Sequence, residues 1–182
     1  MKSYLYGAGV EYALHSLLVL ASSDAPLSVR DLARFQKIPE RFLAKAFTRL
    51  RGANLVAGIE GIAGGFLLAR PAEQIRVLDV LDAIDPGRQL FFCSEIRRNC
   101  TLFGKKPPAW STRGGCRIDL FMKEAEQTLR RFLASKTLAD LVCEFNCKAP
   151  EQFGVESSEW FRQHRVGRAS SRARNRVKRS QP

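Results

Sequence analysis

The first third of the chain carries apolar residues at intervals of three and four, which is the period of an amphipathic helix. A first helix is predicted for residues 7–21. The apolar pattern is then broken by the segment from Ser22 to Pro26. A second helix follows a capping sequence at Ser28-Val29-Arg30-Asp31 and runs to about residue 36. Ile38-Pro39 is a predicted turn, and Pro39 suits the first position of a third helix, which carries apolar residues on one side and basic residues elsewhere. Its predicted buried residues are Phe42, Leu43, Ala46, Phe47 and Leu50.

The pattern changes after residue 54. Two short apolar runs, residues 55–59 and 66–69, flank the glycine-containing stretch Gly61 to Gly65 and predict a two-stranded hairpin. Arg70-Pro71 ends the hairpin, and a short helix is predicted for residues 77–84 before Asp85-Pro86-Gly87 stops it. Two short helices joined by a tight turn and followed by a hairpin are typical of a winged helix-turn-helix.

Residues 88–115 contain several glycines and prolines and are predicted to be mostly loop, which at this length favours a functional segment. A long helix is predicted from about Cys116 to Ala134. One seam of it is apolar, at spacings of four, three, four and three: Ile118, Met122, Ala125, Leu129 and Phe132. Such a seam suits dimerisation, and an ordinary helix packed on its own domain is the alternative. We favour dimerisation because the small winged body offers little surface to cover the helix.

These elements predict a mainly α protein with a small β-hairpin wing. Residues 1–84 would form the winged helix-turn-helix domain and residues 85–115 a cysteine-containing sensor loop. Residues 116–145 would form the dimerisation helix and a short following turn, and residues 146–182 a basic, disordered tail. No internal repeat is present.

The formal net charge of +12 is concentrated at the end of the chain, where residues 162–182 hold eight basic residues and no acidic one. This stretch has few apolar residues with which to offset the entropy of ordering, so we expect it to be disordered. Such an arm could add salt-sensitive phosphate contacts, or it could be a solubilising tail without a specific role.

Other classes of protein fit the composition less well. No segment has the length of uninterrupted apolar sequence that a membrane span needs, and the N-terminus is a poor signal peptide, so we expect a cytoplasmic protein without a membrane partner. Only two histidines are present, no glycine-rich phosphate loop follows a strand, and no Ser/His/Asp set stands out. We therefore predict that the protein is not an enzyme.

Basic residues on the third predicted helix are candidates for DNA contact. Arg41 and Lys45 are four residues apart and share a face, where they could donate to guanine O6 and N7. Arg49 and Arg51 are better candidates for phosphate contact. For each residue alone, a solvated surface charge is an equally good interpretation. The predicted DNA-binding set is completed by Ser28, Gly64 and Gly65.

The chain resembles the Rrf2 family of bacterial transcriptional regulators over about residues 4–142. The matching segments are Glu11-Tyr12-Ala13-Leu14, Val29-Arg30-Asp31-Leu32-Ala33, Ile38-Pro39 with Phe42-Leu43 and Leu50, Gly64 to Arg70, and Val77-Leu78-Asp79-Val80. The resemblance implies a homodimer that presents two winged helices to a pseudo-palindromic operator in double-stranded DNA. Many members have Arg just before the wing glycine, whereas this chain has Glu60 before Gly61, so phosphates would repel the wing at that point.

Cysteines are the candidate sensory chemistry, because cytosolic cysteines are kept reduced and favour metal, cluster or redox roles. Cys93 and Cys100 are separated by six residues, and Cys100 and Cys116 by fifteen, so neither spacing is the short pair of a structural zinc site. Three thiolates on a loop could bind an iron–sulfur cluster, for which we expect 2Fe–2S rather than 4Fe–4S. The family resemblance implies a fourth ligand from the first helix of the other subunit, where Glu11 matches and His15 is a second candidate.

The sequence thus predicts a homodimeric regulator whose operator affinity depends on an iron–sulfur cluster. A cluster-free thiol switch among Cys93, Cys100 and Cys116 remains an alternative, and so does a structural protein that coats DNA without sequence preference. Cys143 and Cys147 are four apart and could form a second thiol switch, although we favour two incidental cysteines because a disulfide across one helical turn would be strained.

Overall fold

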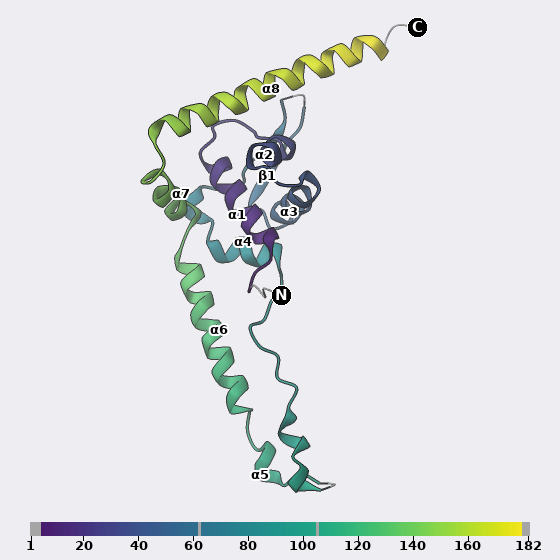
Figure 1. Cartoon of the computed structure of the whole chain (residues 1–182), viewed down its shortest axis with the longest axis vertical. Coiled ribbons are helices and arrows are strands. Elements are labelled where there is room, and N and C mark those ends of the chain that lie inside the picture. The colour runs from purple at the N-terminus through teal and green to yellow at the C-terminus, as the bar shows by residue number, and fades with distance from the viewer. Residues whose placement is uncertain (1–4, 62, 105, 180–182) are drawn as a thin grey trace.

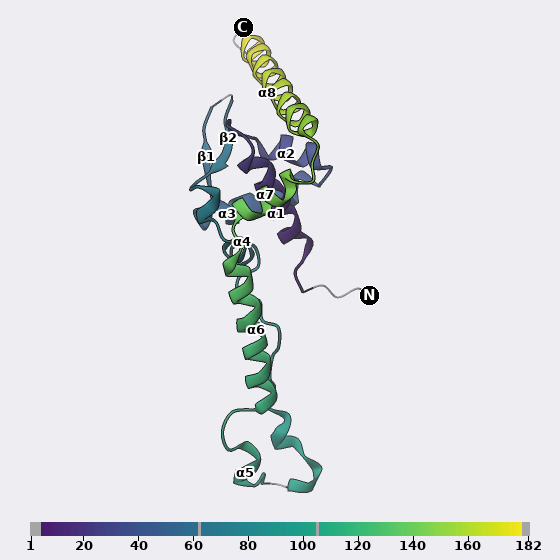
Figure 2. The same ribbon diagram turned by 90° about the vertical axis from the view of Figure 1, so that its left-hand side faces the viewer.

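The computed structural model describes residues 5–61, 63–104 and 106–179. It has a helical body, a long stalk that leaves the body on one side, and a terminal helix that crosses the opposite side (Figures 1 and 2). The body contains α1 (Ala8–Ala21), α2 (Val29–Gln36), α3 (Glu40–Gly52), β1 (Val56–Ile59), β2 (Gly65–Leu68), the 3-10 turn η1 (Ala72–Gln74), α4 (Val77–Ile84) and α7 (Leu138–Asn146). The segment after α4 contains η2 (Ile96–Asn99), η3 (Thr101–Phe103) and α5 (Ala109–Thr112), and α6 (Arg117–Ser135) returns to the body.

The helix-turn-helix forms where the sequence predicted it. Ser28 caps α2, because its Oγ accepts a hydrogen bond of 3.1 Å from the backbone N–H of Asp31. Lys37 ends α2 in the left-handed conformation, with φ 54°, which turns the chain towards α3. Pro39 is the N-cap of α3 and not its first helical residue, a shift of one position from the prediction.

The core lies where α1, α2, α3 and α4 meet the hairpin. Leu17, Leu32, Leu43 and Leu50 are fully buried there, and the ring of Phe47 meets the edge of Phe66 on β2 with 5.0 Å between centroids. Phe42 was predicted to face this core, which is wrong: it is 51% exposed on the outside of α3. Its position, one residue before Leu43, takes it off the buried stripe.

The predicted hairpin is an antiparallel pair in which Val56 faces Leu68 and Ile59 faces Gly65. A further bridge joins Leu27 to Phe66, and both of its backbone hydrogen bonds are made, at 3.0 Å and 2.8 Å. The segment before α2 is therefore paired with the hairpin. This pairing fixes the start of the helix-turn-helix relative to the wing.

The stalk consists of α6 and of the extended chain that follows α4, and the Leu90 N–H of that chain donates to the Glu126 carboxylate of α6 at 3.3 Å. Arg130 donates two hydrogen bonds to the Asp82 carboxylate, at 2.9 Å and 2.7 Å, and so ties α6 to α4. Among the described residues no side chain of α6 is buried, and its seam residues Ile118 and Phe132 are 63% and 61% exposed. An exposed apolar seam of this kind is what a partner helix would cover, and dimerisation through it stays a prediction.

The tail differs from the sequence prediction. Residues Glu151–Arg179 form one helix, α8, so disorder is the wrong description of this part of residues 146–182. Aromatic residues at the start of α8 pack on Phe35 of α2, with ring centroids 4.8 Å away for Phe161 and 5.2 Å for Trp160. Phe161 is only 8% exposed, so apolar burial offsets the cost of ordering this end of the helix. Residues 180–182 lie outside the described residues.

None of the helices in the described part of the chain is both long enough and apolar enough to cross a membrane.

Candidate DNA-binding surface and cysteine site

The outer face of α3 carries the predicted base-reading pair. Arg41 and Lys45 are both exposed and lie one helical turn apart. The guanidinium of Arg41 sits over the ring of Phe42, with 4.9 Å between its central carbon and the ring centroid. This stacking holds the guanidinium on the first turn of α3, which is the part of a recognition helix that approaches base edges. Sequence reasoning missed Phe42 as part of this surface.

The predicted phosphate contacts have different surroundings. Arg51 is exposed at the end of α3. Arg49 is also exposed, but its Nη1 donates a hydrogen bond to the carbonyl of Ile84, the last residue of α4. Arg49 therefore provides a hydrogen-bond donor to the C-terminus of α4, a structural role in addition to the predicted phosphate contact.

Three further predicted residues have clear structural roles. The Ser28 hydroxyl is the cap of α2 described above. A methyl group at Gly64 would overlap the carbonyl oxygen of Ile59, and one at Gly65 would lie 2.5 Å from the carbonyl carbon and oxygen of Leu27. The glycines are required by close approach of the backbone in the hairpin, whether or not DNA touches them. Glu60 is exposed near the hairpin turn.

Two of the three predicted cluster ligands meet at the foot of α6. The Cys93 thiol donates a hydrogen bond to the sulfur of Cys116. Cys116 is the N-cap of α6, and its sulfur also accepts hydrogen bonds from the backbone N–H groups of Asp119 and Ile118. The Cys93 thiol therefore lies beside the Cys116 sulfur, and backbone N–H groups at the start of α6 point towards that sulfur.

This environment moves the two pKa values in opposite directions. The N–H of Asp119 is the main cause that lowers the pKa of Cys116, and the N–H of Ile118, the Cys93 thiol and the charge of Arg97 add to it. A hydrogen bond from the Glu95 N–H lowers the pKa of Cys93. Burial and the bond that Cys93 donates to Cys116 outweigh this effect, so its pKa is raised overall. Of the two thiols, Cys116 is therefore the one that loses its proton at the lower pH.

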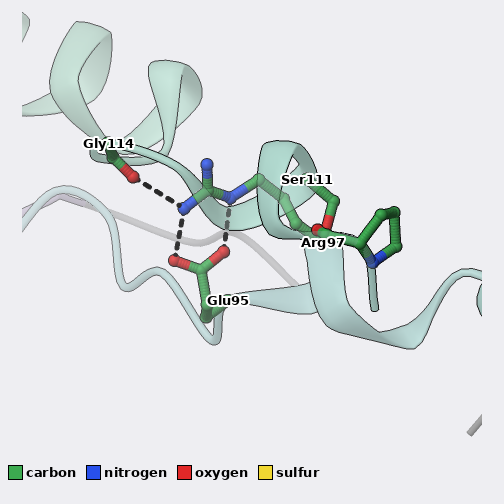
Figure 3. A network of polar contacts seen from close by, with 5 residues as sticks. Glu95, Arg97, Ser111 and Gly114 are labelled. Carbon is green, nitrogen blue, oxygen red and sulfur yellow. Dashed lines mark hydrogen bonds and ion pairs between the residues drawn. The ribbon is translucent and has the colours of Figure 1, made fainter. Parts of the chain in front are cut away.

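Arg97 connects the two segments that carry these cysteines (Figure 3). Its guanidinium donates to both oxygens of the Glu95 carboxylate, at 2.5 Å and 2.7 Å, and to the Gly114 carbonyl at 3.3 Å. Glu95 is two residues after Cys93, and Gly114 is two residues before Cys116. The clamp thus holds the two cysteines side by side. Nearby, the Ser111 hydroxyl donates to the Pro108 carbonyl at 2.8 Å at the start of α5. Arg97 was not predicted from the sequence. The one indication there was that Glu95 and Arg97, of opposite charge, lie between Cys93 and Cys100.

The remaining predicted ligands are not gathered with this pair. Cys100 is exposed between η2 and η3, and Glu11 and His15 are exposed on α1, in the body. Across the described residues of a single chain, no group of three or more His, Cys, Asp or Glu is placed to hold a metal ion. Cys143 and Cys147 are exposed at α7, where they line a shallow pocket with Asp140 and Glu144.

The pKa directions give a test of the pair on the reduced, metal-free protein. Thiolates react with iodoacetamide and thiols do not, so Cys116 should be alkylated well before Cys93 at neutral pH. The difference should shrink as the pH rises through the raised pKa of Cys93, and Arg97→Gln should reduce it at neutral pH. Mass spectrometry of labelled peptides at several pH values measures both rates. Faster labelling of Cys93 at neutral pH would contradict this assignment.

Comparison with known proteins identifies relatives over most of the chain. The model of the Rrf2 family, described as an iron-dependent transcriptional regulator, matches residues 6–144. The HTH-type transcriptional regulator IscR of Yersinia enterocolitica is 31% identical over 135 residues, which are 72% of this chain and 74% of the relative. IscR of Yersinia pestis is equally identical over 133 residues, with the same coverage of both proteins.

Solved structures share the fold at lower identity. IscR of T. potens superposes with a TM-score of 0.60 at 21% identity, covering 80% of this chain and 92% of that protein. CymR of B. subtilis, described as the global cysteine regulator, gives a TM-score of 0.58 at 21% identity and covers 79% and 98%. The oxidised form of CymR of Staphylococcus aureus gives 0.55 at 22% identity and covers 78% and 96%. The predicted winged-helix fold is confirmed.

Proposed function

Because the chain belongs to the Rrf2 family of transcriptional regulators, we propose that it acts as a homodimer whose affinity for its operator is controlled by an iron–sulfur cluster. The proposal rests on the contact between the Cys93 and Cys116 side chains at the N-terminus of α6. That helix also bears the exposed seam expected to join two protomers. A change at the cysteines would therefore act on the element that sets the spacing of the two DNA-reading heads.

The DNA-binding part of the proposal rests on α3 and the hairpin. The exposed pair Arg41 and Lys45 would contact base edges in the major groove, and Arg51 would contact a phosphate. Two such heads in a homodimer would read a pseudo-palindromic site, with one half-site for each protomer. Glu60 makes the hairpin turn a poor partner for phosphate, so α3 would supply most of the sequence preference.

The cysteine pair suits the donor set of a cluster in chemistry and in part of its geometry. Sulfide-bridged iron prefers thiolates, and the N-terminus of α6 already favours charge on Cys116. Cys93, Cys116 and Cys100 would hold the group, with Glu11 of the partner subunit completing the set. When bound, the cluster supplies an iron centre that is sensitive to oxidation, nitric oxide and iron supply. Arg97 keeps Cys93 and Cys116 adjacent, while Cys100 has to move towards them.

A cluster-free thiol switch is a second candidate, favoured by the hydrogen bond between Cys93 and Cys116. The Cys116 thiolate would attack a peroxide, releasing the leaving oxygen as hydroxide or water and forming a sulfenic acid. The Cys93 sulfur would then displace water to form a disulfide. The two electrons lost by the sulfurs reduce the peroxide, and the loop is locked at the foot of α6.

Anaerobic purification with a visible spectrum and iron and sulfide analysis distinguishes the two candidates. The proposal expects visible absorption with matched iron and sulfide, lost in Cys116→Ala and kept in the matched control Cys143→Ala. Colourless, iron-free protein from cells able to assemble clusters would overturn the cluster and favour the thiol switch. Selection of bound sequences from random duplexes by the same samples tests DNA reading separately, because a protein that coats DNA would enrich no sequence.

A further inference from the structure

Helix α8 lies outside the region that the family model matches, which ends at residue 144. It is nevertheless attached to the helix-turn-helix. Phe161 and Trp160 pack on Phe35 of α2, and Phe153 lies 6.4 Å from the same ring. Because Phe161 is nearly buried and belongs to the core, the first half of α8 is a fixed extension of the DNA-binding domain.

The second half of α8 continues one face of this anchored helix as a row of arginines. Counting from Phe161, the residues at steps of four, three, four, four and three share a face of an α-helix, and all five are arginine. They are Arg165, Arg168, Arg172, Arg176 and Arg179. We call this row the arginine stripe. The printed sequence has no acidic residue after Glu159, and Glu159 already pairs with Arg162 at 2.6 Å, so this half of α8 carries no acidic residue of its own beside the stripe.

The course of α8 carries the stripe away from the stalk. The helix crosses the end of the body at which α2 and the β1–β2 turn lie, opposite α6 and the cysteine site (Figures 1 and 2). Arg165 to Arg179 span about 21 Å of helix, the length of about six base pairs of duplex. The stripe is thus long enough to follow DNA beyond the part that α3 reads.

We propose that the arginine stripe binds the phosphate backbone of the DNA that flanks each half-site. This inference rests on the proposed DNA-binding function and adds a second, sequence-independent contact to it. Arginines that recur on one face of a helix suit the regular negative charge of a duplex. It also supplies, from the C-terminal helix, the phosphate contact that Glu60 makes unfavourable at the hairpin turn.

The salt dependence of DNA binding tests the proposal in full-length protein. Replacing the five stripe arginines by glutamine should weaken binding to a duplex with long flanks by about tenfold or more. The slope of log affinity against log salt should fall by about 4.5 if half of the ten arginines in a dimer reach a phosphate. A duplex trimmed to the selected core should show little of either change, and the sequence preference should be retained.

Two matched variants make the result specific. Lysine at the five positions keeps the charge and should keep the salt slope. Arg174→Gln with Lys178→Gln removes charge from the other side of α8 and should have a small effect. The proposal is overturned if the stripe variant has an unchanged salt slope, or if it binds more tightly, as an autoinhibitory helix would require. Loss of sequence selection by unaltered protein would instead overturn the proposed function, and the salt slope on any duplex would still decide the role of the stripe.

Discussion

Replacing Arg41 and Lys45 together by alanine is expected to remove most of the preference for the operator, by about a hundredfold or more. The reason is that both side chains are exposed on the first two turns of α3, the part of a recognition helix that approaches base edges. A well-formed contact from Arg or Lys to guanine contributes about 1–3 kcal/mol of discrimination, and a homodimer uses each residue twice. Competition binding between the selected duplex and a scrambled duplex measures the ratio.

Arg51→Ala is the matched control on the same helix. Arg51 is exposed at the other end of α3, so its loss should weaken binding to both duplexes alike and leave the ratio nearly unchanged. Arg49 is a poorer control because its side chain also bonds the Ile84 carbonyl. An unchanged ratio in the double variant, with affinity falling equally on both duplexes, would show that Arg41 and Lys45 contact phosphates only.

Gly65→Ala is expected to destabilise the folded protein by about 3 kcal/mol, in the upper range for single substitutions. Its new methyl group would lie 2.5 Å from the backbone of Leu27, and backbone atoms cannot move aside as a flexible side chain can. Relief of the overlap would break the bridge between Leu27 and Phe66, which fixes the segment before α2 to the hairpin. Chemical denaturation followed by circular dichroism measures the change in the free energy of unfolding.

Gly58→Ala provides the comparison within the same hairpin. A methyl group there would meet only the ring edge of Phe66, at an ordinary 3.8 Å, so its effect on the free energy of unfolding should be much smaller. Equal stability of the two variants would contradict the structural role assigned to Gly65. If Gly65→Ala folded normally but lost DNA affinity, the glycine would act through the DNA contact that the sequence alone suggested.

The winged helix-turn-helix could be predicted from sequence because its signals are local. The Ser28 cap, the turn before Pro39 and the apolar period of Leu43 to Leu50 each act within a few residues. Phe42 was misplaced because its neighbours are all core residues, and only the position of its Cα on the helix takes its ring to the surface.

The tail and the cysteine site were harder to predict because they depend on contacts between distant residues. Aromatic residues near 160 become ordered only against Phe35 on α2, a partner more than 100 positions earlier. Composition averaged over the tail therefore pointed to disorder. The pairing of Cys93 with Cys116 and their tie through Arg97 likewise depend on how the loop folds back, and the spacing of cysteines in sequence does not report this.

The tie between Arg130 and Asp82 gives α6 the geometry of a lever. The helix is held to the body at this ion pair, and about 20 Å of it extends from there to Cys116 at the far end. A displacement of about 3 Å at that end corresponds to a tilt of about 10° about the contact between Arg130 and Asp82. If two protomers were joined along α6, a small displacement at the cysteines would change the distance between their two helix-turn-helix units.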